Sequence, residues 1–213
     1  MKSIVVFFLI IGISLLGVSS CQKVTKEQIM ENKVDSIYEK AVFGGGCFWC
    51  LEALFHRLDG VISVTSGFAG GHEKNPTYQR VSAGFTGHAE VIQIEFDPTV
   101  ISFEKLLEIF WDMHDSTKLN QQGADYGTQY RSIVLYTSEQ QKITTVRAMK
   151  TLTESKKFAS PIVTEIKELE TFYPAEEYHQ NYFEENKYQP YCNIVIAPKV
   201  KHFTERYGSL FKK

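Results

Sequence analysis

Two cysteines separated by two aromatic residues, directly after a run of glycines, are the residues of this chain best suited to chemistry. An apolar, strand-like segment ends in Gly44-Gly45-Gly46, and Cys47-Phe48-Trp49-Cys50 follow. We expect Cys47 in the first turn of a helix, where free backbone N–H groups stabilise an anion and lower the pKa of a thiol. The pattern favours a reactive thiol beside a small apolar pocket. The alternative is that Cys47 is simply a small buried side chain, as many free cysteines are.

A carboxyl group in an apolar strand is the second candidate. Side chains alternate along a strand, so Glu90 shares its face with Ile92, Ile94 and Phe96. Desolvation there raises the pKa of a carboxyl group, and an acid that stays protonated near neutral pH can donate a proton. The alternative is a glutamate at the end of the strand that reaches water.

Two further segments are rich in polar or aromatic side chains. Residues 121–132 form a long polar stretch, which in a compact domain is more often functional than not. Residues 176–182 place Tyr178 and Tyr182 on one face of an expected helix, beside His179. Such a stripe is more often core than pocket, and His179 alone is more often structural than catalytic.

The N-terminal residues 1–20 have the pattern of a secretory signal peptide. A charged start is followed by an apolar run at 4–18, which is shorter than the roughly 20 apolar residues of a membrane span. Val18-Ser19-Ser20-Cys21 resembles the lipobox of bacterial lipoproteins, and this implies a lipid on Cys21. We expect residues 21–39 to be a polar tether and the protein to be an exported, membrane-anchored lipoprotein of the bacterial envelope. An uncleaved anchor helix is the alternative.

The number of cysteines limits what the thiols can do. If Cys21 of the four cysteines carries lipid, Cys47, Cys50 and Cys192 remain. Three thiols do not make a disulfide scaffold, so a redox pair with a third participant is the better explanation. A zinc site would need a fourth ligand, and no second paired spacing of cysteine or histidine exists, so we expect no metal.

Residues 40–213 are expected to fold as one domain of the α+β class. The order of elements from 41 to 137 predicts an elaborated ferredoxin-like βαββαβ two-layer sandwich with a C-terminal extension. The net charge of −2 favours no nucleic-acid partner. The expected strands are 41–43, 61–69, 90–96, 131–137 and 162–169, and the expected helices are 47–58, 77–84, 102–111, 139–157 and 176–185.

Several motifs together resemble one known family. The stretch at 44–49 resembles the active-site signature of peptide methionine sulfoxide reductases of the A type. The family pattern continues, in order and from 40 to 213, at 75–78, 87–90, 123–131, 174–176, 178–180 and 191–192. One departure is Cys50, where the family usually has another residue.

The resemblance implies reduction of methionine S-sulfoxide, free or in oxidised proteins, with no metal or organic cofactor. Cys47 would attack the sulfoxide sulfur and Glu90 would donate a proton to the oxygen. The remaining implied roles are oxygen binding by Tyr78 and Tyr130, ordering of the site by Asp125, and substrate binding by Phe48, Trp49 and His179.

The resemblance further implies a sulfenic acid on Cys47, a disulfide with a second cysteine, and an external dithiol reductant such as a thioredoxin-like protein. Either Cys50 or Cys192 can resolve the intermediate, or both in series, with proximity favouring Cys50. We expect a monomer. Two rival interpretations are a thioredoxin-like disulfide oxidoreductase and a non-catalytic surface lipoprotein with an unreactive Cys47.

Overall fold

The computed structural model describes residues 37–213. The predicted signal peptide at 1–20, most of the tether at 21–39 and the predicted lipid attachment at Cys21 lie outside the described residues. Within the described part of the chain, no helix is both long and apolar enough to cross a membrane.

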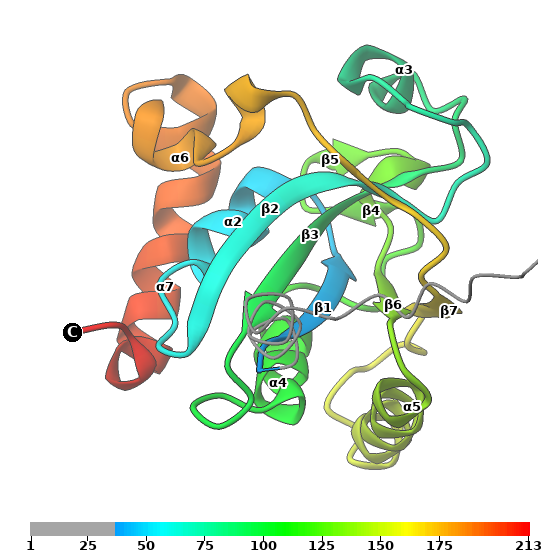
Figure 1. The fold of residues 1–213 in the computed structure, drawn as a ribbon, viewed down its shortest axis with the longest axis vertical. Helices are drawn as coiled ribbons and strands as arrows, with labels where there is room; N and C mark the ends of the chain where they lie inside the picture. Colours follow the sequence, from blue (N-terminus) through cyan, green and yellow to red (C-terminus); the bar gives the residue numbers. More distant parts are fainter. Residues whose placement is uncertain (1–36) are drawn as a thin grey trace, which may run out of the picture.

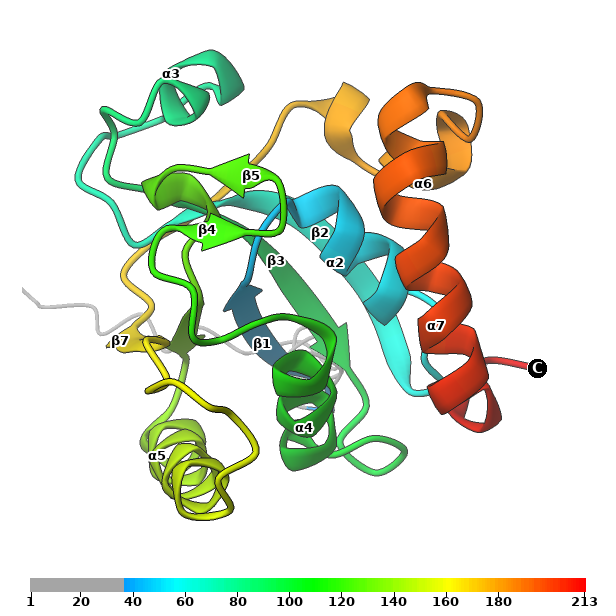
Figure 2. The ribbon, with the colours of Figure 1, turned by 180° about the vertical axis from the view of Figure 1, so that it is seen from behind.

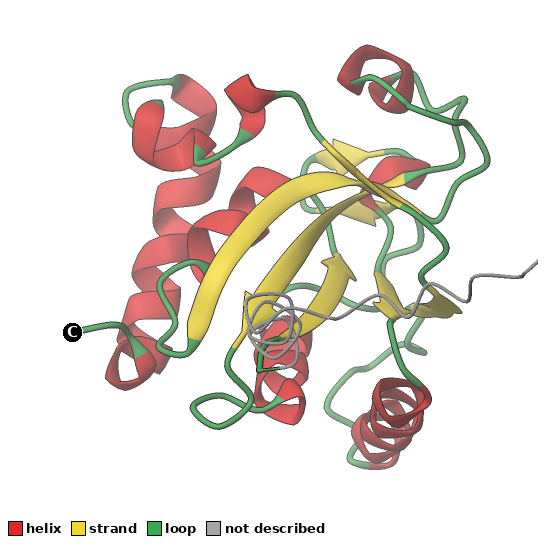
Figure 3. Ribbon diagram, in the orientation of Figure 1, coloured by secondary structure: helices red, strands yellow, loops and turns green. Residues whose placement is uncertain are grey.

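A six-stranded sheet organises the domain (Figures 1 and 3). The strands lie in the order β7-β6-β1-β3-β2-β8. All neighbours are antiparallel except β6 and β7, which are parallel. The strands are β1 (Glu39–Gly44), β2 (Val61–Ala69), β3 (Ala89–Phe96), β6 (Ile133–Tyr136), β7 (Glu165–Glu168) and β8 (Phe172–Pro174).

Helices cover one face of this sheet, as Figure 2 shows for α2, α4 and α7. Ser102 caps α4 by accepting a hydrogen bond from the backbone N–H of Lys105, which explains where that helix begins. The helices are α2 (Phe48–Phe55), α3 (Tyr78–Ser82), α4 (Phe103–Met113), α5 (Glu139–Glu154), α6 (Tyr182–Glu185) and α7 (Ala197–Tyr207). The expected α+β class is confirmed.

The main core lies between the sheet and α2 and α4. The predicted face of β3 points into it, because Ile92, Ile94 and Phe96 are fully buried against aromatic and aliphatic side chains of both helices. The opposite face of the sheet carries a smaller cluster, to which Ala89 and Val91 of the same strand contribute. Alternation along β3 therefore separates two cores, and Glu90 belongs on the side of the larger one.

Two segments differ from their prediction, and the C-terminal extension contains elements that were not predicted. The polar stretch expected as a loop contains a small hairpin, β4 (Gln121–Gln122) with β5 (Asp125–Tyr126), followed by the turn η1 (Thr128–Tyr130). The helix expected at 176–185 is wrong, because Pro174 ends β8 and only a turn, η2 (Glu177–His179), and the short α6 follow. The C-terminal extension forms a π-helical turn, η3 (Cys192–Ile196), which continues into α7.

Candidate active site

A glycine turn between β1 and α2 delivers Cys47. Gly46 has φ +98°, and a Cβ added there would lie 2.7 Å from Cγ of Gln122 in the β4–β5 hairpin. Only glycine therefore fits both the conformation and the space. Cys47 is the N-cap residue with an extended backbone (φ −61°, ψ 126°), and the helix itself begins at Phe48. The thiol thus lies just before the first turn, one position earlier than the sequence predicts.

The carboxyl group of Glu90 reaches the same helix start from β3. The backbone N–H of Phe48, the residue after Cys47, donates a hydrogen bond of 3.1 Å to Oε2 of Glu90. The Glu90 side chain is buried, with 1% of its surface exposed. Burial raises the pKa of this carboxyl to about 8, against the lowering effect of the Phe48 N–H. The structure therefore brings together Cys47 and a carboxylic acid that is protonated at neutral pH, as the sequence predicts.

The thiols of Cys47 and Cys50 differ in pKa. Burial and a hydrogen bond to Cys50 raise the pKa of Cys47 well above its ordinary value. The same hydrogen bond from Cys47 and the charge of Lys199 lower the pKa of Cys50 to about 7. The expected lowering of the pKa at Cys47 is therefore wrong for the resting pair. The pair therefore favours the thiolate on Cys50, in the first turn of the helix, with the Cys47 thiol as hydrogen-bond donor.

Tyr191 connects the C-terminal segment to the nucleophile. Its hydroxyl donates a hydrogen bond of 2.8 Å to Oδ2 of Asp125 in β5. The same hydroxyl lies within hydrogen-bonding reach of Cys47, and this contact lowers the pKa of that thiol. Asp125, which the sequence singled out, therefore contacts Tyr191, a residue to which the sequence analysis gave no role.

Aromatic side chains form a wall beside Cys47. Phe48 is completely buried, and Tyr78 from α3 stacks near it at 6.3 Å between ring centroids. Trp49 stacks face to face on Tyr182 of α6, with ring centroids 3.7 Å apart and 8° between the planes. Its indole N–H donates a hydrogen bond of 3.2 Å to Nδ1 of His179.

His179 lies behind this wall. It is 1% exposed, and burial lowers the pKa of its ring, which is therefore neutral with its proton on Nε2. The predicted stripe of Tyr178 and Tyr182 on one helical face is wrong, because Tyr178 belongs to the turn η2 and is mostly exposed, whereas Tyr182 stacks on Trp49.

Two tyrosine hydroxyls complete the surroundings of the acid. Tyr78 is the first residue of α3, and Tyr130 is the last residue of the turn η1. Burial, with the nearby charge of Glu90 as the next cause, raises the pKa of both phenols. Both groups therefore stay protonated and can donate hydrogen bonds to an oxygen near Glu90.

The third cysteine is also buried. Cys192 begins η3 and has no exposed surface. Desolvation, followed by the charge of Cys50, raises its pKa, so its thiol is protonated at neutral pH. The described residues contain no group of histidine, cysteine or acidic side chains arranged to hold a metal ion.

The comparisons with known proteins agree with this geometry. The family described as "Peptide methionine sulfoxide reductase" matches residues 39–210. The chain belongs to this family. A peptide methionine sulfoxide reductase MsrA of Nautilia profundicola is 56% identical over 164 residues, which cover 77% of this chain and 93% of that protein.

Solved structures of similar proteins extend the likeness to the fold. Methionine sulfoxide reductase A of Corynebacterium diphtheriae is 34% identical, with a TM-score of 0.65 over 72% of this chain and 78% of that chain. Mxr1 from Saccharomyces cerevisiae in reduced form is 31% identical, with a TM-score of 0.67. The match covers 74% of this chain and 90% of that chain.

Membership in the family establishes the reaction. The enzyme reduces methionine S-sulfoxide to methionine through cysteine redox chemistry, as a peptide-methionine (S)-S-oxide reductase. Neither a thioredoxin-like disulfide oxidoreductase nor a non-catalytic lipoprotein accounts for this membership, and both rival interpretations are rejected.

Three residues of the reductase site have no strong signal in the sequence. Tyr191 lies in the family pattern at 191–192 but was given no role, and Tyr182 was expected on a helical face with Tyr178 and not against Trp49. Nothing in the sequence singles out Lys199, whose Nζ lies 3.6 Å from Sγ of Cys50. Contacts between segments so far apart in the chain are decided by the fold.

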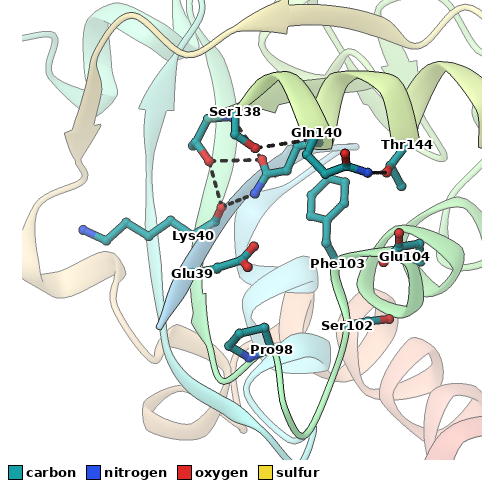
Figure 4. A pocket seen from close by; sticks show the side chains of 11 residues that line it. Glu39, Lys40, Pro98, Ser102, Phe103, Glu104, Ser138, Gln140 and Thr144 are labelled. Carbon is teal, nitrogen blue, oxygen red and sulfur yellow. Dashed lines mark hydrogen bonds between the residues drawn. The ribbon is translucent and has the colours of Figure 1, made fainter. Parts of the chain in front are cut away.

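A separate hollow of about 530 Å³ lies between β1, α4 and α5 (Figure 4). Polar groups at its wall are hydrogen-bonded to each other, as Gln141 Nε2 and Thr137 Oγ1 both are to the backbone carbonyl of Lys40. None of the predicted site residues lines this hollow, so it has no part in the chemistry described above.

Proposed function

We propose that Cys47 and Glu90 carry out the reduction of the sulfoxide as nucleophile and acid. The observation that carries this assignment is the hydrogen bond from the Phe48 N–H to the buried Glu90 carboxyl, directly beside Cys47. It supports a proton donor that lies next to the sulfur nucleophile at the start of α2. Phe48 and Trp49 supply the apolar wall for the methyl group of the substrate.

The first step forms a bond between Cys47 sulfur and the sulfoxide sulfur. Cys47 first gives up its proton, for which the Cys50 thiolate is the nearest acceptor. Glu90 gives a proton to the sulfoxide oxygen, and Tyr78 and Tyr130 donate hydrogen bonds to it. The hydroxyl group then moves from the substrate sulfur to the Cys47 sulfur: the substrate S–O bond breaks, an S–O bond to Cys47 forms, and methionine leaves with both electrons of the sulfur–sulfur bond. Cys47 is left as a sulfenic acid. Asp125 holds the Tyr191 hydroxyl, and His179 holds the Trp49 ring.

A second thiol, Cys50 or Cys192, condenses with the sulfenic acid to a disulfide and releases water. An external dithiol, such as a thioredoxin-like protein, reduces that disulfide by thiol exchange, so the two electrons need no metal or organic cofactor. A single-turnover experiment tests the assignment. The reduced enzyme is mixed with one equivalent of methionine S-sulfoxide or R-sulfoxide, and released methionine and the new disulfides are measured. Release from the R epimer, or release without oxidation of any cysteine, would contradict it.

We further propose that the protein is an exported lipoprotein, anchored through a lipid on Cys21 with residues 21–39 as tether and acting as a monomer. The lipobox-like end of the apolar run supports this. Mass spectrometry of the mature N-terminus in a bacterial host tests it. A Cys21→Ala chain that still remains with membranes after a carbonate wash would indicate an uncleaved helix instead.

The ferredoxin-like description of the core is also proposed. It is supported by the order β6-β1-β3-β2, in which every neighbouring pair is antiparallel, and by the position of α2 and α4 between successive strands of the chain. The edge strands β7 and β8 and the segment from 175 onward would then be the extension.

A further inference from the structure

A cation from the C-terminal helix faces the redox pair. Nζ of Lys199 on α7 lies 3.6 Å from Sγ of Cys50, and α7 packs directly against α2. Cys50 is 4% exposed and Lys199 is half-buried, so little water separates the two groups. An ion pair in such a place is screened by salt much less than a pair on the surface.

We propose that Lys199 is a positioning residue for the second half of the reaction: it holds Cys50 as a thiolate and thereby makes Cys50, and not Cys192, the thiol that resolves the oxidised Cys47. This inference rests on the proposed function of Cys47.

Lys199 is the cation that contacts the Cys50 sulfur. The other titratable groups that interact with this sulfur come from several elements, and they are Cys47, Glu90 of β3, Asp125 of β5, Tyr191 and Cys192 of η3. Glu90 is protonated below about pH 8, so the acidic charge that opposes the thiolate at neutral pH is that of Asp125. The position of Cys50 in the first turn of α2 adds the favourable field of the helix N-terminus.

The two candidate resolving thiols therefore differ in charge. The pKa of Cys50 is lowered to about 7, whereas desolvation and the Cys50 charge raise the pKa of Cys192. The thiolate is the attacking species in disulfide formation. Once Cys50 has released the proton that it took from Cys47, the charge of Lys199 favours its thiolate, whereas Cys192 must lose a proton in a place without exposed surface.

The resolving step is balanced without a further reactant. The Cys50 sulfur attacks the sulfur of the Cys47 sulfenic acid and forms the S–S bond, while the S–O bond breaks. The leaving hydroxide takes up one proton and becomes water, so the net change is one sulfenic acid and one thiol to one disulfide and one water. Cys192 can accept the disulfide afterwards by exchange.

The test compares the full-length reduced enzyme with Lys199→Met, Lys199→Arg and, as a matched control on the exposed side of α7, Lys201→Met. Each protein receives one equivalent of methionine S-sulfoxide. Released methionine reports the first step, dimedone trapping reports sulfenic acid, and mass spectrometry of the quenched protein identifies which disulfide forms first.

We expect wild type, Lys199→Arg and Lys201→Met to form the Cys47–Cys50 disulfide first. In Lys199→Met this disulfide should form roughly tenfold more slowly at about pH 7, because losing an opposite charge at this distance changes a pKa by at least about one. Dimedone-trapped sulfenic acid and the Cys47–Cys192 disulfide should increase in its place. The slow step should recover as the pH is raised, which a general loss of packing would not produce.

A second measurement does not depend on the folding of any Lys199 variant. The ultraviolet thiolate absorbance of the reduced wild type, compared with Cys50→Ser, should contain a transition with a midpoint of about 7 that is missing in the variant. The inference is wrong if that transition is absent, or if Lys199→Met forms the Cys47–Cys50 disulfide at the wild-type rate. An enzyme that releases no methionine at all would refute the proposed function instead.

Discussion

The two halves of the active site are built in different ways. Cys47 and Glu90 belong to β1–α2 and β3, where Glu90 is paired with Phe68 in the β2–β3 ladder and the sheet holds the backbone continuously. Tyr191, Cys192 and Lys199 belong to the segment after the edge strand β8, and hydrogen bonds that involve side chains attach the beginning of this segment. Gln180 bonds to the backbone N–H and carbonyl of Ser66, and the carboxylate of Glu52 accepts hydrogen bonds from the N–H groups of Asn181 and Tyr182.

This difference suggests a division of labour. The first step needs a nucleophile and an acid in fixed geometry, and groups on strands and helix starts of a packed core provide that. Resolution by Cys50 depends on the charge of Lys199, and later exchange can involve Cys192, so the C-terminal segment contributes to the second half of the reaction. The following variants test how far the two halves are independent, in order of decreasing expected effect.

Cys47→Ser should abolish the reaction, because a hydroxyl group at its ordinary pKa is a far weaker nucleophile than a thiolate. Methionine release from the S-sulfoxide should fall to the background without enzyme. The fold should persist, since the side chains have nearly the same size. Methionine release in this variant would mean that another group begins the reaction and that the comparison of the two halves is mistaken.

Glu90→Gln should slow methionine release by about 10²–10⁴-fold, the usual contribution of an acid catalyst. Glutamine can still accept the Phe48 N–H bond but has no proton to transfer. In the wild type, the protonated fraction of Glu90 falls as pH rises through about 8, so the rate of the first step should decline above that pH. This alkaline decline should be missing from the variant.

Stability provides a control for the same variant. The folded-state pKa of Glu90 lies above its unfolded value, so the unfolded chain releases this proton first and the wild type loses stability as pH rises towards about 8. The melting temperature of Glu90→Gln, relative to that of the wild type, should therefore be higher at alkaline pH than at acidic pH. An unchanged difference between the two melting temperatures across this range would show that Glu90 is not buried as an acid.

Tyr191→Phe should slow the first step by roughly tenfold, because it removes one hydrogen bond. A hydrogen bond contributes about 1–1.5 kcal/mol, which corresponds to a rate change of about that size. The hydroxyl lies between Asp125 and Cys47, and its loss should raise the pKa of the Cys47 thiol further. Tyr188→Phe, at a side chain that is 96% exposed, is the matched control. Equal rates for the two variants would remove Tyr191 from the first step and leave it only a role in anchoring.

Gln180→Ala should have the smallest effect on the chemistry and act mainly on stability. It leaves polar groups of Ser66 and Ala175 without their partner, which costs about 1–3 kcal/mol of unfolding free energy. Methionine release should change only a few-fold, while limited proteolysis within the C-terminal segment should become faster. The exposed Gln189→Ala serves as control. A loss of the first step as large as that of Glu90→Gln would show that the two halves are not separable.

The sequence by itself determined the chemistry and most of the sheet. The glycine run before Cys47, the alternation that puts Glu90 among apolar residues, and the apolar stripe of α4 are local patterns, and each depends on periods of two or 3.6 residues that any chain obeys. The order of motifs along the chain was enough to predict the family. The helix expected at 176–185 failed because Pro174 can end a strand as well as begin a helix, and β8 pairs with β2 only in the folded chain.

Only the tertiary structure decided where the charge of the redox pair rests. From the sequence, Cys47 was the cysteine with the lowered pKa, because a helix start is a local feature. The fold buries the Cys47 thiol. It also places Lys199 beside Cys50, although the two residues are 149 positions apart in the chain. A pKa is set by the sum of desolvation and of charges a few ångströms away, and such neighbours come from α7, β5 and β3, whose positions no local pattern around the cysteines can encode.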